Sequence, residues 1–146
     1  MNAPPERNAR RFDHLDLRVG NRAEARAFYG RVGPLLGFPY AEDAGEWTCF
    51  CALPPPAVGE YLAVIEDPAH RPGRTCHALW AESRAAVDAI AAGLRAAGAP
   101  ALEGPAMYYW GHYAVYFEDP AGNRFEVCYR EFNHNFDPRI PPAAGS

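Results

Sequence analysis

The stretch DHLDLRV at residues 13–19 decides the fold, because a weaker copy of it, CHALWA at residues 76–81, occurs later in the chain. Each copy is followed by a similar helix opening, NRAEARAF at residues 21–28 and SRAAVDAI at residues 83–90. The offset is 63 at the histidines (77 − 14) and 62 at the helix starts (83 − 21). Self-similarity at a nearly constant period predicts a duplicated structural unit.

The first half begins with an alternating segment, residues 12–19, which predicts a strand with one polar and one apolar face. His14 lies on the polar face together with Asp16 and Arg18. A helix is expected over residues 21–33 with Asn21 as its N-cap, and Gly33-Pro34 and Gly37 are expected to break it. Three short strands are expected after it, at residues 39–42, 47–53 and 61–66.

The second half repeats this order. We expect a strand at 75–81, a helix capped by Ser83 that runs to about residue 97, a loop at 100–105, and strands at 113–118 and 124–131. The pattern predicts an α+β fold in which two βαβββ modules form an open barrel-like mixed sheet with the helices outside. The expected boundaries are a disordered leader at 1–10, modules at 11–67 and 75–132, and a tail at 133–146.

Composition excludes several classes of partner for this chain of 146 residues. A net charge of −4 offers no basic surface for nucleic acid. No apolar stretch approaches the roughly 20 residues that span a bilayer, so no membrane partner is expected. The first residues lack the apolar segment of a secretory signal, which predicts a cytoplasmic protein whose four cysteines are reduced thiols.

Two histidines and two glutamates recur in the two halves: His14 with Glu66, and His77 with Glu126, the glutamates being offset by 60 (126 − 66). Alternation in the last strand puts Glu126 on the polar side together with Arg124, Cys128 and Arg130. A buried carboxylate there has to be paired or ligated. Arg18 and Arg124 are alternative ion-pair partners for it. Imidazole nitrogen and carboxylate oxygen suit one divalent metal, namely Fe, Mn, Ni, Co or Zn.

The chain resembles the vicinal oxygen chelate superfamily, which includes glyoxalases, bleomycin-resistance proteins and extradiol dioxygenases. The resemblance spans roughly residues 11–131 and rests on His14–Val19, Ala27–Tyr29, Leu36–Phe38 and, most specifically, Glu118–Val127 with its Asp-Pro-Ala-Gly-Asn turn. It implies metal ligands at His14, His77 and Glu126. Glu66 fits the place of a fourth ligand in glyoxalase-I-like members, whereas dioxygenase-like members have no ligand there.

The resemblance implies a metal-dependent lyase or isomerase that binds a small oxygen-chelating substrate. Members of the superfamily often form dimers, so the resemblance also implies a homodimer. Glu66 or Glu126 would act as the catalytic base, and Tyr116 would either donate to the substrate or only pack in the sheet. The candidate substrate contacts are Arg18, Tyr109, Trp110 and His112.

Two alternatives to the lyase or isomerase remain open. One is an extradiol-type dioxygenase, although Met107, Tyr108 and Tyr109 occupy the positions where such enzymes carry a catalytic histidine, and His112 lies too close to Tyr116. The other is a metal-free small-molecule-binding or resistance protein. The superfamily hosts all three classes of activity.

Overall fold

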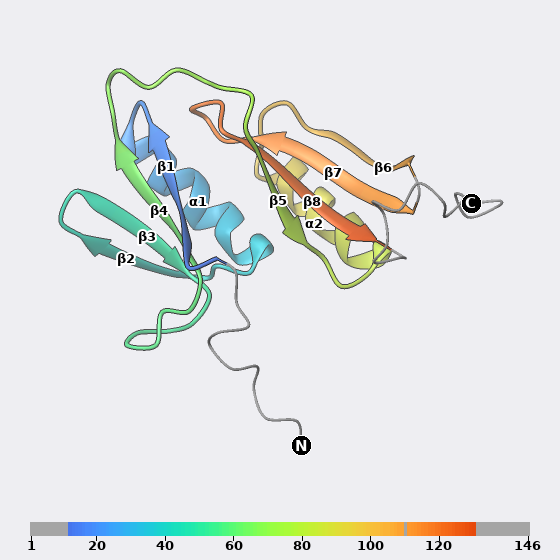
Figure 1. Ribbon diagram of the computed structural model, residues 1–146, viewed down its shortest axis with the longest axis horizontal. Coiled ribbons are helices and arrows are strands. Elements are labelled where there is room, and N and C mark those ends of the chain that lie inside the picture. Colours follow the sequence, from blue (N-terminus) through green and yellow to red (C-terminus); the bar gives the residue numbers. More distant parts are fainter. Residues whose placement is uncertain (1–11, 110, 131–146) are drawn as a thin grey trace. The chain divides into compact units, whose positions relative to one another are not determined.

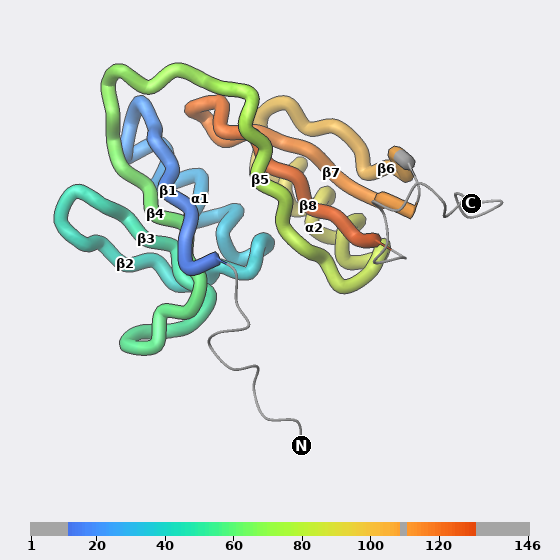
Figure 2. The backbone as a smooth tube through the Cα atoms, viewed as in Figure 1, coloured from blue at the N-terminus to red at the C-terminus, as the bar shows by residue number. Residues whose placement is uncertain are grey.

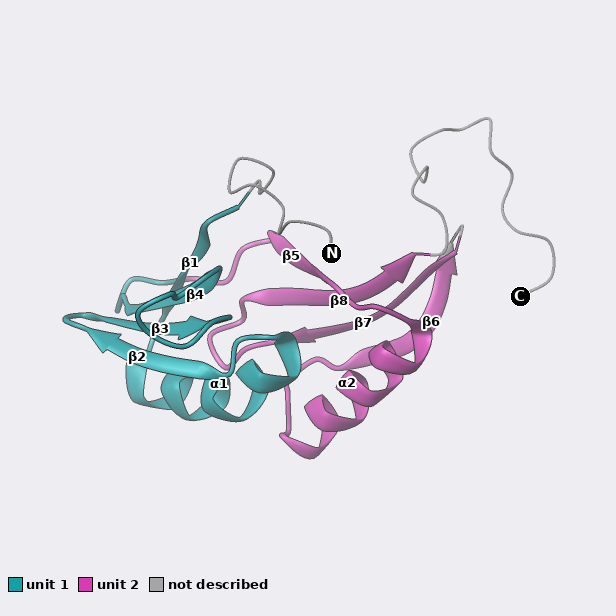
Figure 3. Ribbon diagram, turned by 90° about the horizontal axis from the view of Figure 1, so that it is seen from below, with its two compact units in different colours: residues 1–70 teal, residues 71–146 magenta. Residues whose placement is uncertain are grey.

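The computed structural model describes residues 12–109 and 111–130 and shows two units with the same order of elements (Figure 1). The chain divides into these units between His70 and Arg71, in the gap between the modules expected at 11–67 and 75–132. Figure 3 distinguishes the two units by colour.

The first unit contains four strands and one helix, in the order β1 (His14–Val19), α1 (Arg22–Leu36), β2 (Tyr40–Ala44), β3 (Trp47–Cys51) and β4 (Tyr61–Glu66). The strands form a sheet with the order β1-β4-β3-β2. Strand β1 runs parallel to β4, and the other neighbours are antiparallel. The parallel pair lies side by side in the backbone trace of Figure 2.

The second unit repeats this arrangement with β5 (Cys76–Trp80), α2 (Arg84–Ala96), β6 (Glu103–Tyr109), β7 (His112–Glu118) and β8 (Arg124–Arg130). Its sheet has the order β5-β8-β7-β6, and β5 runs parallel to β8. The predicted α+β class and the pair of βαβββ modules are confirmed. Within the described residues, the strands form two four-stranded mixed sheets and do not close into a barrel.

In each unit the helix covers one face of the sheet, because alternation along the strands makes that face apolar. In β1, Leu17 and Val19 are each 1% exposed, whereas His14, Asp16 and Arg18 are exposed on the other face, as predicted. The apolar core of the second unit consists of Val87, Ala91, Leu94, Val115, Phe117, Phe125 and Val127. The face opposite the helix is thus left for polar side chains in both units.

Two local predictions were wrong, and proline was the cause in each. Helix α1 does not break at Gly33-Pro34 but continues to Leu36, and it closes at Gly37, the other expected break, whose φ is 91°. The closing turn is satisfied because the Phe38 N–H donates to the Gly33 carbonyl.

The segment at 100–105, expected to be a loop, contains the start of β6. Pro105 is tolerated there because β6 is an edge strand. A register shift between Glu103 and Ala106 also accommodates the proline.

Several predicted features lie outside the described residues, namely the leader at 1–10, Trp110 and the tail at 133–146. Within the described part of the chain, no helix is long and apolar enough to cross a membrane.

Candidate functional site

The second sheet carries a polar cluster on its face opposite α2. Tyr113 of β7 donates a hydrogen bond to Asp88 of α2, so Tyr113 and every second residue of β7 lie on the helix side. His112, Ala114 and Tyr116 therefore lie on the opposite face. The β7–β8 register then places two residues of β8 on that face as well, since Glu126 pairs with Tyr116 and Cys128 with Ala114.

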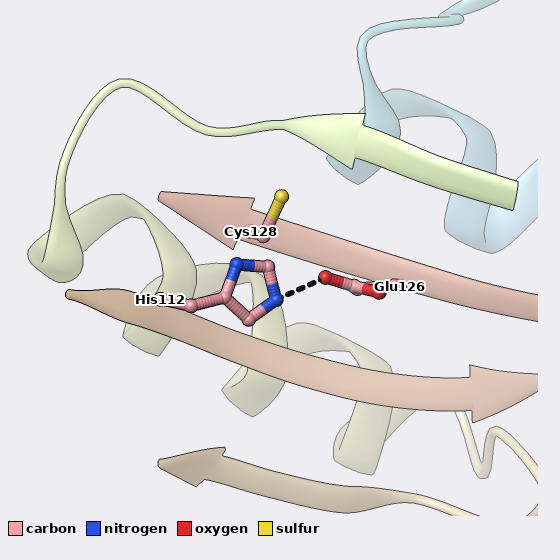
Figure 4. Close-up of side chains that lie close together, drawn as sticks. All are labelled: His112, Glu126 and Cys128. Atoms are coloured by element: carbon pink, nitrogen blue, oxygen red, sulfur yellow. Dashed lines mark ion pairs between the residues drawn. The ribbon is translucent and has the colours of Figure 1, made fainter. Parts of the chain in front are cut away.

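His112, Glu126 and Cys128 converge on this face, and one potential ligand atom of each lies within 4.8 Å of the others. Figure 4 shows the His112 ring and the Glu126 carboxylate pointing toward each other, with the Cys128 sulfur beside them. His112 Nε2 forms an ion pair with Glu126 Oε1. The side chains of His112 and Glu126 are only 2% and 12% exposed, so water screens this pair weakly.

Two thiols lie in the field of the Glu126 carboxylate. Burial raises the pKa of the Cys128 thiol, the charge of Glu126 raises it further, and Arg130 opposes both effects. Burial followed by Glu126 likewise raises the pKa of Cys76, and here Arg124 opposes the shift. Glu126 is therefore the negative centre of a polar surface that combines thiol, imidazole and guanidinium groups.

Aromatic rings border the cluster on the same face. The Arg124 guanidinium carbon lies 5.4 Å from the centroid of the Tyr116 ring, and the Tyr108 and Tyr116 rings meet edge to face at 5.1 Å. Burial raises the pKa of Tyr108, and the charges of Glu103 and then Glu126 add to this shift. Tyr116, predicted as a site residue, is thus the direct neighbour of Glu126 across the sheet.

His77, expected to be a ligand together with Glu126, lies on the other face of the second sheet. In the β5–β8 register His77 pairs with Phe125, whereas Ala78 pairs with Glu126. The His77 ring lies 5.1 Å from the ring of Phe125, and its Nδ1 donates to the Arg124 carbonyl at 3.1 Å. The structure therefore does not bring His77 and Glu126 to one metal ion.

His14 and Glu66 are also kept apart within the first unit. His14 pairs with Tyr61 and Glu66 with Val19, so the two lie five residues apart along the paired strands, roughly 16 Å at the usual rise. Glu66 Oε2 instead accepts a hydrogen bond of 2.8 Å from the backbone N–H of Arg22, the first residue of α1.

The His14 ring stacks on the ring of Tyr61 at 4.7 Å and contacts a carboxylate at each ring nitrogen. Nδ1 lies 2.6 Å from Asp13 and Nε2 lies 3.3 Å from Asp16. Arg18, a predicted substrate contact, lies on the same face of β1, with its guanidinium carbon 5.4 Å from the centroid of the Trp47 ring. Tyr109, another predicted contact, is the last residue of β6.

Sequence reasoning assigned His112 only to substrate contact and gave Cys128 no role. Alternation in the last strand had already put Cys128 on the same side as Glu126. The change in the repeat offset, from 63 at the histidines to 62 at the helix starts, was a second signal that His77 need not be the counterpart of His14. With an offset of 62, His14 aligns with Cys76 (14 + 62), and His77, one residue later, then points to the other face of the strand.

The sequence matches the family described as Glyoxalase/Bleomycin resistance protein/Dioxygenase superfamily over residues 11–127. This chain therefore belongs to that superfamily, as its motifs predicted. A search of the curated proteins finds no match.

Solved structures share the fold across both units. A glyoxalase/bleomycin resistance protein from Albidiferax ferrireducens T118 has a TM-score of 0.64 and 20% identity, and the alignment covers 82% of this chain and 98% of that one. Lactoylglutathione lyase from Agrobacterium tumefaciens has a TM-score of 0.60 and 22% identity, covering 86% and 95%. The fosfomycin resistance protein FosX from Listeria monocytogenes has a TM-score of 0.61 and 18% identity, covering 82% and 92%.

Proposed function

We propose that this chain is a divalent-metal-dependent lyase or isomerase of glyoxalase-like type that acts on a small substrate with neighbouring oxygen atoms. The observation that carries the proposal is the buried ion pair of His112 and Glu126, which stands on the face of the second sheet opposite the helix. Membership of the superfamily supports a small-molecule substrate. We further propose that the protein acts as a cytoplasmic homodimer, as its composition and family resemblance imply.

The donor atoms present fit a mid-row divalent ion. His112 and Glu126 offer an imidazole nitrogen and a carboxylate oxygen from one face, which suits Fe, Mn, Ni, Co or Zn. The pair of His77 and Glu126 does not fit, because its members lie on opposite faces of the sheet. A bound ion would act as a Lewis acid toward a substrate carbonyl.

Glu126 would carry the proton transfer. Its carboxylate would accept the proton from the carbon next to the carbonyl as a general base and return it to the neighbouring carbon. His112, which faces Glu126 Oε1, would keep the carboxylate in position. Arg124 and Tyr116 lie beside the carboxylate and would orient the oxygen atoms of the substrate.

The test measures exchange of the carbon-bound hydrogen of simple α-hydroxyketones with deuterated water, by NMR, in protein loaded with Zn²⁺, Co²⁺ or Mn²⁺. We expect Glu126→Gln to slow exchange by about 100-fold or more, as removal of a general base does. Glu118→Gln is the matched control, because Glu118 lies on the same face but outside the cluster. Exchange that persists in Glu126→Gln at the rate of the unaltered protein would contradict the proposal.

A metal-free binding protein is the second candidate, and the same ion pair favours it. His112 Nε2 and Glu126 Oε1 already contact each other directly, so each of these polar atoms has a partner without a bound ion. Metal analysis of protein purified without chelator separates the two candidates. One divalent ion per chain, lost in Glu126→Gln, supports the enzyme, whereas its absence together with tight binding of a small molecule supports the binding protein.

A further inference from the structure

Cys128 differs from an ordinary buried cysteine in its surroundings. It is 4% exposed, it follows Glu126 by two residues on β8, and it lies on the same face of the sheet. Apolar neighbours normally surround a free buried thiol, which then acts as a small hydrophobe. Here the sulfur lies beside an imidazole and a carboxylate instead (Figure 4).

The three side chains are close enough to serve one ion together. The ligand atoms of His112, Glu126 and Cys128 all lie within 4.8 Å of one another, and two ligands of a tetrahedral ion with bonds of 2.0–2.3 Å are separated by roughly 3.3–3.8 Å. Small adjustments of the side chains would therefore bring all three atoms to bonding distance. Among the described residues, this is the group of three His, Cys, Asp or Glu side chains whose potential ligand atoms all lie within 4.8 Å of one another.

The composition of the group sets the metal class. Oxygen-only sites suit Mg²⁺ and Mn²⁺, whereas a thiolate shifts preference toward Zn²⁺ and similar borderline ions. Three protein ligands, one of them sulfur, also leave a fourth position of a tetrahedral ion open, as catalytic zinc sites do.

We propose that His112, Glu126 and Cys128 form a mixed nitrogen, oxygen and sulfur site that binds a thiophilic divalent ion of the Zn²⁺ or Co²⁺ type, within the second unit alone. The inference rests on the proposed function for the role of the ion and adds the thiolate ligand and the metal class. On binding, the Cys128 thiol releases its proton to solvent as the sulfur–metal bond forms.

The test titrates Co²⁺ into the full-length reduced chain and records the near-ultraviolet band of sulfur-to-cobalt charge transfer. The unaltered chain should develop this band to one equivalent, and Zn²⁺ should abolish it by displacing Co²⁺. Cys128→Ser should lose the band and bind Co²⁺ at least about 10-fold more weakly, by analogy with losses seen when metal sites are perturbed. Cys49→Ser, in the first unit, should keep both the band and the affinity.

Several outcomes would overturn the inference. They are the absence of a band in the unaltered chain, a band that survives in Cys128→Ser, and a band that is lost in Cys76→Ser but not in Cys128→Ser. Cys128→Ala, checked for native circular dichroism, provides a second folded variant. If Co²⁺ binds to one equivalent without a thiolate band, this inference fails and the proposed function stands. If the thiolate band appears but Glu126→Gln leaves the rate of hydrogen exchange unchanged, the proposed function fails and this inference stands.

Discussion

The two units share one topology but bury polar side chains on different faces of the sheet, since Thr48 lies on the helix side of the first sheet and His112 on the opposite face of the second. In the first unit, Arg22 of α1 fastens the helix to the β2–β3 hairpin, because its guanidinium donates to Thr48 Oγ1 and to the carbonyls of Gly45 and Trp47 at 2.8–3.0 Å. In the second unit the buried polar cluster lies on the face away from the helix. Arg22 and Thr48 thus join helix to sheet in the first unit, whereas the buried imidazole and carboxylate of the second unit face each other on the side away from the helix.

A comparison by register shows how this difference arises on the central strands. His14 pairs with Tyr61 in the first unit, and Cys76 pairs with Arg124 at the same place in the second. Two residues further along, Ala63 occupies the position of Glu126. The next position on the same face holds an apolar isoleucine in the first unit and Cys128 in the second. At these two positions of its central strand, the first sheet therefore has neither a carboxylate nor a thiol.

The neighbouring strands differ in length and in bulk. Strand β3 has five residues, whereas β7 has seven and adds His112 at the end that β3 lacks. Trp47 stands where the second unit has Ala114, because Trp47 pairs with Ile65 of β4 and Ala114 pairs with Cys128 of β8. A longer strand and a small residue leave room for the imidazole to reach Glu126. Within one fold, these local changes decide which unit can carry a site.

The largest expected effect separates the two histidines of the second unit. His112→Gln should weaken Co²⁺ binding by about 100-fold or more, because loss of a direct ligand exceeds the 10–100-fold cost of losing a supporting contact. His77→Gln should leave the affinity nearly unchanged, since His77 lies on the helix side beside Phe125. Isothermal titration calorimetry at constant pH measures both. A large loss of Co²⁺ affinity in His77→Gln with no loss in His112→Gln would show that His77, and not His112, is the metal ligand.

The next effect tests whether the small residue at position 114 makes the cluster possible. Ala114 is 0% exposed, so Ala114→Leu should lower the free energy of unfolding by about 1–3 kcal/mol through overpacking. It should also weaken Co²⁺ binding by about 10-fold, because the added atoms displace His112 from Glu126. Urea denaturation and Co²⁺ titration measure the two effects.

Ala114→Gly is the control, since it keeps the space open and should retain the affinity even though it loosens the strand. Equal Co²⁺ affinities for Ala114→Leu and the unaltered chain would show that the bulk of Trp47 does not explain why the first unit lacks a cluster.

Most of the fold followed from local signals in the sequence. Alternation located β1 and β8. The side chains of the N-caps Asn21 and Ser83 each accept one hydrogen bond from the backbone N–H three residues later, as their residue types predicted. The strand β6 was missed because Gly104-Pro105 has the composition of a loop, and only the position of this strand at the sheet edge makes the proline acceptable.

The site was less predictable, because it depends on register between strands that are distant in sequence. Alternation placed Glu126 and Cys128 on one side of β8 correctly, but it contains no information on the partner strand. The side of His77 depends on its pairing with Phe125, and the proximity of His112 to Glu126 depends on the β7–β8 register. A slip of one residue in the repeat is enough to put His77 on the helix side of β5 and Cys76 on the face of Glu126.

The smallest expected effect concerns Glu66, whose place at the end of β4 has no counterpart in the cluster of the second unit. Glu66→Gln removes a negative charge from the N-terminus of α1, where the carboxylate accepts from the Arg22 N–H at 2.8 Å. The unfolding free energy should fall by about 0.3–1 kcal/mol at low salt, and less at high salt, because the interaction of a charge with a helix terminus is screened.

Glu46→Gln, which alters an exposed acid of the β2–β3 turn, should change stability less, and neither variant should alter Co²⁺ affinity. If Glu66→Gln instead weakened Co²⁺ binding while stability stayed constant, Glu66 would return as a metal ligand.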